Sequence, residues 1–152
     1  MSQKEISIRR FIESDASHAS SLIRYCWESM HLGDYEAEGI ASQLESTTPE
    51  KLFALMESTK LYVAERNGEI IAFGGFDKER VRLLFIHPEF QRNGIGTLLL
   101  NKIISDARND GLTRLDCNST IYAVPFYLKN GFTPGEIVDF GSIYFRVMTV
   151  EL

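Results

Sequence analysis

The stretch that decides the fold is QRNGIG, residues 91–96, which stands between the apolar run VRLLFI (81–86) and the leucine-rich segment TLLLNKII (97–104). The first run is typical of a buried strand, and the second has the spacing of apolar side chains that predicts a helix. Glycine costs backbone entropy wherever it sits, so two glycines at a strand-to-helix junction indicate that a ligand approaches the main chain closely. The free N–H groups and the dipole at a helix start favour an anion, and phosphate is the usual one.

Composition narrows the class of protein. A chain of 152 residues and 17.3 kDa is about one domain, and 44% apolar with 24% charged residues is ordinary for a soluble globular protein. The net charge of −5 argues against nucleic-acid binding and favours a neutral or cationic substrate. The N-terminus lacks the apolar core of a signal peptide and the length of a membrane span, so we expect a cytoplasmic protein that does not bind membranes. Cys26 and Cys117 lack metal-binding spacing, so we expect two reduced thiols and no metal site.

Apolar periodicity and turn residues divide the chain into strands and helices. Asn67-Gly68 is the clearest local signal, because it accommodates the positive φ angles of a two-residue hairpin between strands 61–66 and 69–76. Strand 80–86 has an apolar end that suits a central strand covered on both faces, and a helix follows from Ile95 to Gly111. The other predicted segments are strands at 5–11, 113–118, 136–140 and 143–152 and helical pieces at 14–31, 35–45, 48–58 and 122–131. The pattern predicts a mixed α/β sheet with one strand–helix–strand crossover in its middle.

Three phosphate-binding designs compete for the QRNGIG loop. A Walker loop ends in Gly-Lys-Ser/Thr, whereas Thr97 directly follows the second glycine here, so that design is excluded. A dinucleotide-binding fingerprint needs a third glycine where this chain has Leu99, although Asp116 lies near the distance expected of a ribose-binding carboxylate. That fingerprint normally opens its fold, and here four predicted strands come first. A dinucleotide-dependent enzyme therefore stays open as an alternative.

The third design rests on a family resemblance. Segments FIHPEFQRNGIGTLLLNKIISDARNDG (85–111) and NSTIYAVPFYLKNGF (118–132) resemble the GNAT family of acetyl-CoA-dependent N-acyltransferases, whose pyrophosphate loop reads Gln/Arg-x-x-Gly-x-Gly/Ala. The second segment carries A-x-x-F-Y-x-x-x-G-F from Ala123 to Phe132. The resemblance covers most of the chain and implies one acyltransferase domain over residues 1–152, with acetyl-CoA (coenzyme A) as cofactor. It also implies an α+β fold, with a mostly antiparallel sheet of about seven strands flanked by about four helices.

The resemblance assigns roles to particular residues. Tyr127 is expected to protonate the departing sulfur, since a phenol with an ordinary pKa of about 10 can serve as the acid. Asn118 is expected to hydrogen-bond the cofactor arm or orient the substrate, and the N–H group of Ile86 or His87 to stabilise the carbonyl oxygen. Side chains in place of the two loop glycines would stand where phosphate oxygens must pack. The residues expected to bind the cofactor are Phe85, Ile86, His87, Gln91, Arg92, Asn93, Gly94, Ile95, Gly96, Thr97, Ser119 and Phe126.

The chain departs from the family at the general base. The glutamate that some members carry in the strand before the loop falls on Arg80, and Glu79, one residue away, should face the wrong side. A water relay, Asp77, Glu36 or Glu38 all remain open as the base.

Several residues also have ordinary structural interpretations. His87 at a strand end favours a hydrogen-bonded role over that of a base. Trp27, Tyr25 and Tyr35, together with Met30, could form an acceptor wall, but core packing is favoured for Trp27.

The resulting hypothesis is an N-acetyltransferase that moves an acetyl group from acetyl-CoA directly to a primary amine of a small molecule or a peptide. The alternative is a non-catalytic sensor or structural module that binds acyl-CoA, which the missing carboxylate permits. The acidic composition favours polyamines, aminoglycosides or peptide amines as acceptors. Segment 143–152 would be a risky apolar edge if exposed, so a homodimer that pairs through it is also expected.

Overall fold

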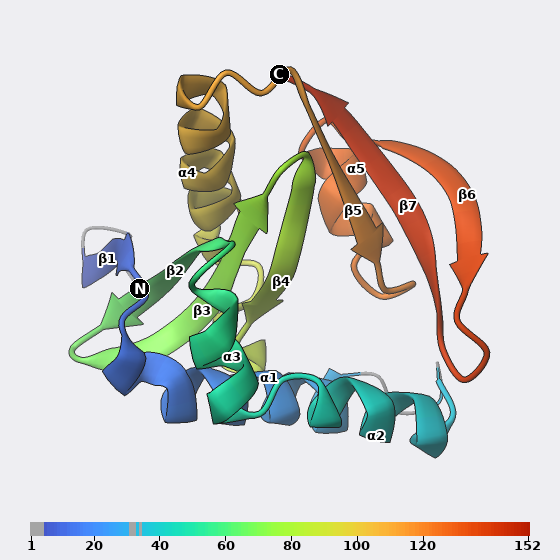
Figure 1. Ribbon diagram of the computed structural model, residues 1–152, viewed down its shortest axis with the longest axis horizontal. Helices are drawn as coiled ribbons and strands as arrows, with labels where there is room; N and C mark the ends of the chain where they lie inside the picture. Colours follow the sequence, from blue (N-terminus) through green and yellow to red (C-terminus); the bar gives the residue numbers. More distant parts are fainter. Residues whose placement is uncertain (1–4, 31–32, 34) are drawn as a thin grey trace.

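The computed structural model describes residues 5–30, 33 and 35–152, and these residues fold around one seven-stranded sheet of order β1-β2-β3-β4-β5-β7-β6 (Figure 1). Every neighbouring pair is antiparallel except β4 and β5, so the mixed, mostly antiparallel sheet with one crossover is confirmed. The strands are β1 (Ile6–Arg10), β2 (Lys60–Arg66), β3 (Glu69–Asp77), β4 (Arg80–Ile86), β5 (Arg114–Ser119), β6 (Thr133–Asp139) and β7 (Tyr144–Glu151). The helices are α1 (Ala16–Met30), α2 (Ala37–Glu45), α3 (Pro49–Leu55), α4 (Ile95–Asn109) and α5 (Val124–Lys129), with 3-10 turns η2 (Glu13–Asp15) and η3 (Pro88–Phe90).

Local sequence signals set most of these boundaries. Asn67 and Gly68 adopt φ angles of 51° and 79°, which confirms the predicted hairpin turn. Thr48 caps α3, its hydroxyl accepting a hydrogen bond from the Lys51 N–H at 3.4 Å, and proline fills the first helical position. The N-terminal helix starts later than predicted because η2 precedes it, and its predicted end at His31 lies outside the described residues.

Helices cover both faces of the sheet, and each face has its own core. On one face, α4 buries Ile95, Leu99 and Ile103 against residues of β2, β3 and β5. On the other face, α1 buries Ile23 and Trp27 together with α3 and the opposite side of β2 and β3. In Figure 1, α1 and α2 run along the lower edge of the view, and α4 and α5 stand on either side of β4. Among the described residues, no helix is both long and apolar enough to cross a membrane.

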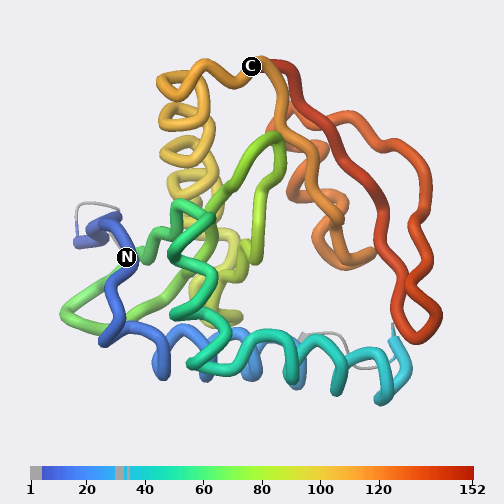
Figure 2. Tube along the Cα trace, viewed as in Figure 1, coloured from blue at the N-terminus to red at the C-terminus, as the bar shows by residue number. Residues whose placement is uncertain are grey.

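The two parallel strands separate almost as soon as they meet. Within the described part of the chain, Arg80 and Asp116 form the only residue pair in register between β4 and β5, and Figures 1 and 2 show the strands diverging from that point. The pairing of β3 with β4 also shifts between Phe73 and Gly75, opposite Leu83, whose φ of +56° marks a β-bulge. As expected, β4 is a central strand with side chains packed against the cores on both faces, although among its residues only Val81 is fully buried and those after it are half-buried beside the separation.

The last strand is internal. β7 pairs with β5 on one side and with β6 on the other, so the apolar segment 143–152 is no sheet edge. The homodimer was expected because this segment could be an exposed apolar edge, and that reason is wrong. The edge strand on that side of the sheet is β6.

We predict that Gly75→Ala destabilises the fold strongly, because an added Cβ would overlap the carbonyl oxygen of Lys60 on β2. The free energy of unfolding should fall by about 3 kcal/mol, as expected for overpacking in a buried strand. Gly135→Ala on the edge strand is the matched control, since its Cβ would make only ordinary contacts at 3.4 Å or more. Urea unfolding of both variants measures the difference, and equal midpoints would contradict this account of the β2–β3 pairing.

Candidate active site

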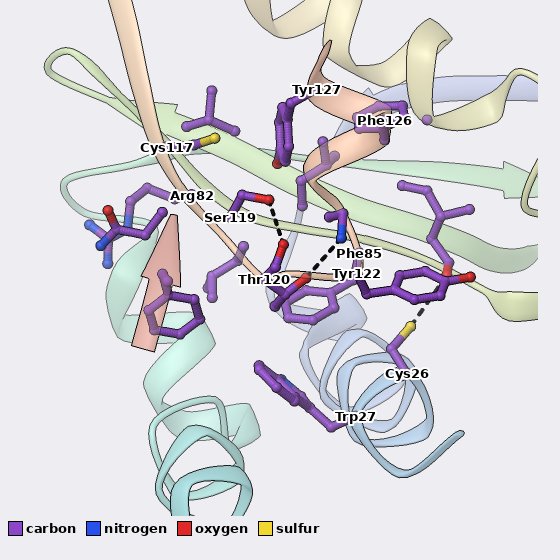
Figure 3. Close-up of a pocket in the computed structure, with 18 of the residues that line it drawn as sticks. Cys26, Trp27, Arg82, Phe85, Cys117, Ser119, Thr120, Tyr122, Phe126 and Tyr127 are labelled. Carbon is purple, nitrogen blue, oxygen red and sulfur yellow. Dashed lines mark hydrogen bonds between the residues drawn. The ribbon is translucent and has the colours of Figure 1, made fainter. Parts of the chain in front are cut away.

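The separation of β4 and β5 opens a cleft of about 950 Å³. Its wall is formed by β4, β5, the 91–97 loop, α5 and parts of α1, α2 and α3. Figure 3 shows Trp27 approaching this cavity from α1, Tyr127 and Phe126 approaching from α5, and Arg82 at one side. Residues far apart in sequence thus meet around one space.

The bulge in β4 gives the cleft two chemically different sides. Leu84 and Ile86 pack with the core under α4, whereas Leu83 and Phe85 pack with the core under α1. We call these the α5 side and the α1 side of the cleft. Arg82 belongs to the α1 side, because side chains alternate along a strand and the preceding Val81 lies in the α4 core.

The end of β4 presents its main chain to the cleft. The His87 N–H donates to the Ile71 carbonyl of β3 at 2.8 Å, so the N–H and C=O of Ile86, one residue earlier, point to the opposite side of the strand. The Ile86 carbonyl accepts from the Gln91 side-chain amide at 3.1 Å and from the Cys26 thiol at 3.3 Å. Of the two N–H groups expected to meet a carbonyl oxygen, only that of Ile86 faces the open edge.

The glycine loop forms the start of α4. Gly94 is the N-cap with φ +81°, and Arg92 before it has φ +68°, so the loop needs two left-handed residues. The N–H groups of the first helical turn, from Ile95 onward, have no partner within the helix. Gly96 lines the cleft, and an added Cβ there would lie 2.9 Å from Cε1 of Phe126, so the protein itself crowds this position.

Tyr127 is a buried phenol on the α5 side. Its ring packs edge-on against Phe126 at 5.2 Å and Phe132 at 5.1 Å between centroids, and its hydroxyl interacts with the Cys117 sulfur. Burial raises the pKa of Tyr127 well above its ordinary value, and the neighbouring thiol raises it further. Burial likewise raises the pKa of Cys117 to about 12, so both groups hold their protons at neutral pH.

The charges of the cleft wall are all of one sign. Among the described residues, no aspartate, glutamate or histidine lines it. Its charged members are five cations: Lys51, Arg80, Arg82, Arg92 and Lys129.

None of the three carboxylates considered as the base lies in this wall. Asp77 accepts a hydrogen bond from the Thr59 hydroxyl at 2.6 Å and forms an ion pair with Arg82 at 2.9 Å. Glu36 and Glu38 are exposed around the start of α2.

The structure brings most of the sequence-predicted residues together. The residues of that set that line the cleft are Phe85, Ile86, Gln91, Arg92, Gly94, Gly96, Thr97, Asn118, Ser119, Phe126 and Tyr127. His87, Asn93 and Ile95 do not line it. Asn93 is exposed on the loop, and Ile95 is fully buried in the core under α4.

His87 has the structural role that the sequence favoured. Its Nδ1 accepts from the Glu89 N–H at 3.1 Å, which caps η3. Its ring stacks on Tyr25 at 5.0 Å and faces a second, smaller hollow on the outside of α1.

The sequence did not predict most of the cleft wall that α1, α2 and α3 supply. Of the proposed aromatic acceptor wall, Trp27 lines the cleft while also being buried in the core, whereas Tyr25 and Tyr35 do not line it, and the side chain of Met30 lies outside the described residues. The missed residues share no motif: they are Cys26, Gln43, Ser46, Thr47, Lys51, Leu52 and Leu55. Tyr122 also lines the cleft, and its hydroxyl donates to Oε1 of Gln91 at 2.9 Å.

A mixed sheet that opens between its two parallel strands, beside a glycine turn at a helix start, is the arrangement that the resemblance to GNAT acyltransferases implies. Residues 31–152 match the family model described as an acetyltransferase (GNAT) domain. The chain therefore belongs to the GNAT acetyltransferase family.

Solved structures share this fold over the whole chain. A GCN5-related N-acetyltransferase from Rhodopseudomonas palustris matches with a TM-score of 0.86 at 20% identity, covering 100% of this chain and 99% of that one. The PaiA N-acetyltransferase from Thermoplasma acidophilum, in complex with coenzyme A, matches with a TM-score of 0.84 at 23% identity and covers both chains fully.

By sequence, the chain is 31% identical over 88 residues to the amino-acid acetyltransferase of Yersinia pseudotuberculosis. The match covers 54% of this chain but only 20% of that relative, so the chain spans about one fifth of its length.

We predict that both cysteines resist alkylation in the folded protein. Burial raises the pKa of Cys26 and of Cys117 to about 12, so neither presents an accessible thiolate at pH 8. Mass spectrometry after iodoacetamide treatment should show no label without denaturant and full label in urea. Ser105→Cys, at an exposed position of α4, is the positive control and should be labelled at once. Rapid native labelling of Cys117 would contradict the burial described for the α5 side.

Proposed function

We propose that the protein is an N-acetyltransferase that moves an acetyl group from acetyl-CoA directly to a primary amine of a small molecule or a peptide. The observation that carries the proposal is that one cleft joins the helix start at Gly94 to the buried phenol of Tyr127. An anion site and a proton donor at two ends of one cavity suit a cofactor with a phosphate group and a thioester. The coenzyme A bound in the Thermoplasma neighbour and the name of the Yersinia relative support this direction.

The residues present fit such a cofactor. The N–H groups of the first turn of α4, with Arg92 beside them, would hold the pyrophosphate. The main chain of β4 before Ile86, along the edge that β5 leaves open, would pair with the amide groups of the pantetheine arm, as a strand would. Phe85, Thr97, Ser119 and Phe126 complete this part of the wall, and Asn118 lies where it can orient the reacting groups. When bound, acetyl-CoA supplies an acetyl group already activated as a thioester.

In this proposal, Tyr127 acts as the acid. Burial on the α5 side raises the pKa of the Cys117 thiol to about 12, which shows that this environment disfavours a thiolate. A sulfur that leaves as a thiolate in the same surroundings is strongly basic and takes a proton readily, even from a phenol whose own pKa is raised. The Ile86 N–H faces the open edge, where it can donate to a carbonyl oxygen that becomes negative.

The acceptor must reach the cleft as a neutral amine. No carboxylate or histidine lines the wall among the described residues, so proton removal falls to water or happens before binding. A described wall without a base also fits the alternative, a non-catalytic sensor that binds acyl-CoA. An assay separates the two functions. A sensor would bind acetyl-CoA and never release its thiol in the presence of amines.

We predict that Tyr127→Phe lowers turnover at least about a hundredfold, since it removes the proton donor and keeps the ring that packs on Phe126 and Phe132. The Kd for acetyl-CoA, measured by calorimetry, should change by no more than about twofold. Tyr144→Phe, at an exposed position of β7, is the control and should leave turnover unchanged. Turnover of Tyr127→Phe equal to that of the wild type would remove the assigned acid.

We also predict that kcat/KM rises with pH along the titration of the acceptor. Below the pKa of the ammonium group, the neutral fraction and therefore the rate increase about tenfold per pH unit. Tyr127 stays protonated throughout, because its pKa is raised, so no falling limb should appear near neutral pH. Two acceptors of different pKa should give profiles with different inflections. A common inflection near pH 6 for both would indicate a protein base instead.

A further inference from the structure

The cleft is positively charged although the protein is negatively charged. The chain has a net charge of −5, yet the described residues of the cleft wall include five cations and no carboxylate. Arg92 on the glycine loop and Lys129 on α5 belong to the side that suits a phosphorylated cofactor. The other three cations, Lys51, Arg80 and Arg82, come from α3 and from the start of β4, on the α1 side.

Arg82 is held in place and still has donors to offer. Its Nη1 binds Asp77 at 2.9 Å, and Asp77 is fixed in turn by the Thr59 hydroxyl at 2.6 Å. This contact uses only one of the five N–H donors of a guanidinium, and among the described residues no other protein group binds them. With its side chain 36% exposed in the cleft wall, Arg82 is ready for a second planar anion.

The neighbouring cations are not neutralised by the protein. Lys51 donates to the uncharged main-chain carbonyl of Glu45 at 2.7 Å. Arg80 forms no ion pair among the described residues, and Asp116, its partner in register, is ion-paired with Arg114 at 3.0 Å. The α1 side therefore keeps a surplus of positive charge.

Such a surface selects against the cationic acceptors that the net charge suggested. A polyamine or an aminoglycoside would bring like charge to Lys51, Arg80 and Arg82, whereas a carboxylate would find charge-assisted donors. Pairing that carboxylate with Arg82 also cancels the field that keeps an adjacent ammonium protonated. An α-amino group free of that field has a pKa of about 7.7–8.0, as at a peptide N-terminus, against about 10.4 for an alkylamine. A cleft wall without a base can thus still receive a neutral amine.

We propose that the acceptor is a free α-amino acid or a close analogue, whose carboxylate is bound on the α1 side by Arg82 with the help of Lys51. This inference rests on the acetyl transfer proposed above. In the reaction, the amine nitrogen forms a bond to the acetyl carbon and the carbon–sulfur bond breaks. The proton lost by the amine passes to water, the sulfur takes a proton from Tyr127, and the Tyr127 phenolate regains a proton from water, so that no net proton is gained or lost.

The test compares acceptors that differ only in the carboxylate. Each common α-amino acid is assayed for release of the CoA thiol beside its decarboxylated amine and its carboxamide, at equal concentration and pH. For the best amino acid, kcat/KM should exceed that of both analogues that lack the carboxylate by roughly tenfold or more. Equal or faster reaction of the decarboxylated amines would overturn the inference while leaving acetyl transfer itself intact.

Variants assign the carboxylate contact to particular side chains. Arg82→Gln should raise KM for the amino acid roughly ten- to a hundredfold and leave KM for the decarboxylated amine within about twofold. Arg82→Lys should keep part of the preference. Because Arg82→Gln leaves Asp77 without its cation, Lys51→Gln, at an exposed position of α3, serves as a second variant that preserves the fold and should also weaken the preference.

Arg24→Gln, on the exposed face of α1, is the matched control and should change neither KM. An unchanged preference in both Arg82→Gln and Lys51→Gln would overturn the assignment. If no acceptor of any kind releases thiol, although calorimetry shows that acetyl-CoA binds, the proposed function fails and this inference fails with it.

Discussion

The parting of β4 and β5 is the constraint on which the rest of the structure depends. Two parallel strands that share one residue pair, Arg80 with Asp116, leave main-chain groups facing each other across a gap, and buried groups of this kind need partners. The protein meets part of this need itself, because Gln91 and Cys26 both donate to the Ile86 carbonyl. A ligand that runs along the strand can meet the rest. The gap is thus a site for an extended molecule, with the helix start of α4 at one end of it.

The same burial that shapes the cleft sets its acid–base character. Removing Tyr127 and Cys117 from water penalises their charged forms, so both pKa values rise and both protons stay in place. In the proposed reaction, a leaving thiolate would meet the same penalty, which would drive the proton toward it. No general base is needed to start the chemistry if the acceptor arrives neutral. The cations on the α1 side reinforce this order of events, because they disfavour a protonated amine near Arg82.

Sequence predicted the fold well where the signals are local and poorly where they are not. The turn at Asn67-Gly68 and the first turn of α3 follow from residues that have few other conformations open to them. The position of β7 inside the sheet depends on pairing between distant segments, which apolar content alone does not specify. The bulge at Leu83 has no characteristic residue, yet it decides which side chains of β4 face each side of the cleft. The wall residues of α1, α2 and α3 were missed because helix packing, not a motif, brings them there.

The net charge of the chain and the charge of the described cleft wall have opposite signs, and this difference has a physical consequence. Exposed charges are screened over about 8 Å at physiological ionic strength, so the total of −5 acts at long range on solubility and encounter. Inside a cleft, the few charges within contact distance dominate, and water screens them less. Asp77 illustrates the difference: it counts toward the acidic total, but its contact with Arg82 fixes a cation in the wall. An acidic chain can therefore build a cleft for anions by placing its carboxylates one layer behind its cations.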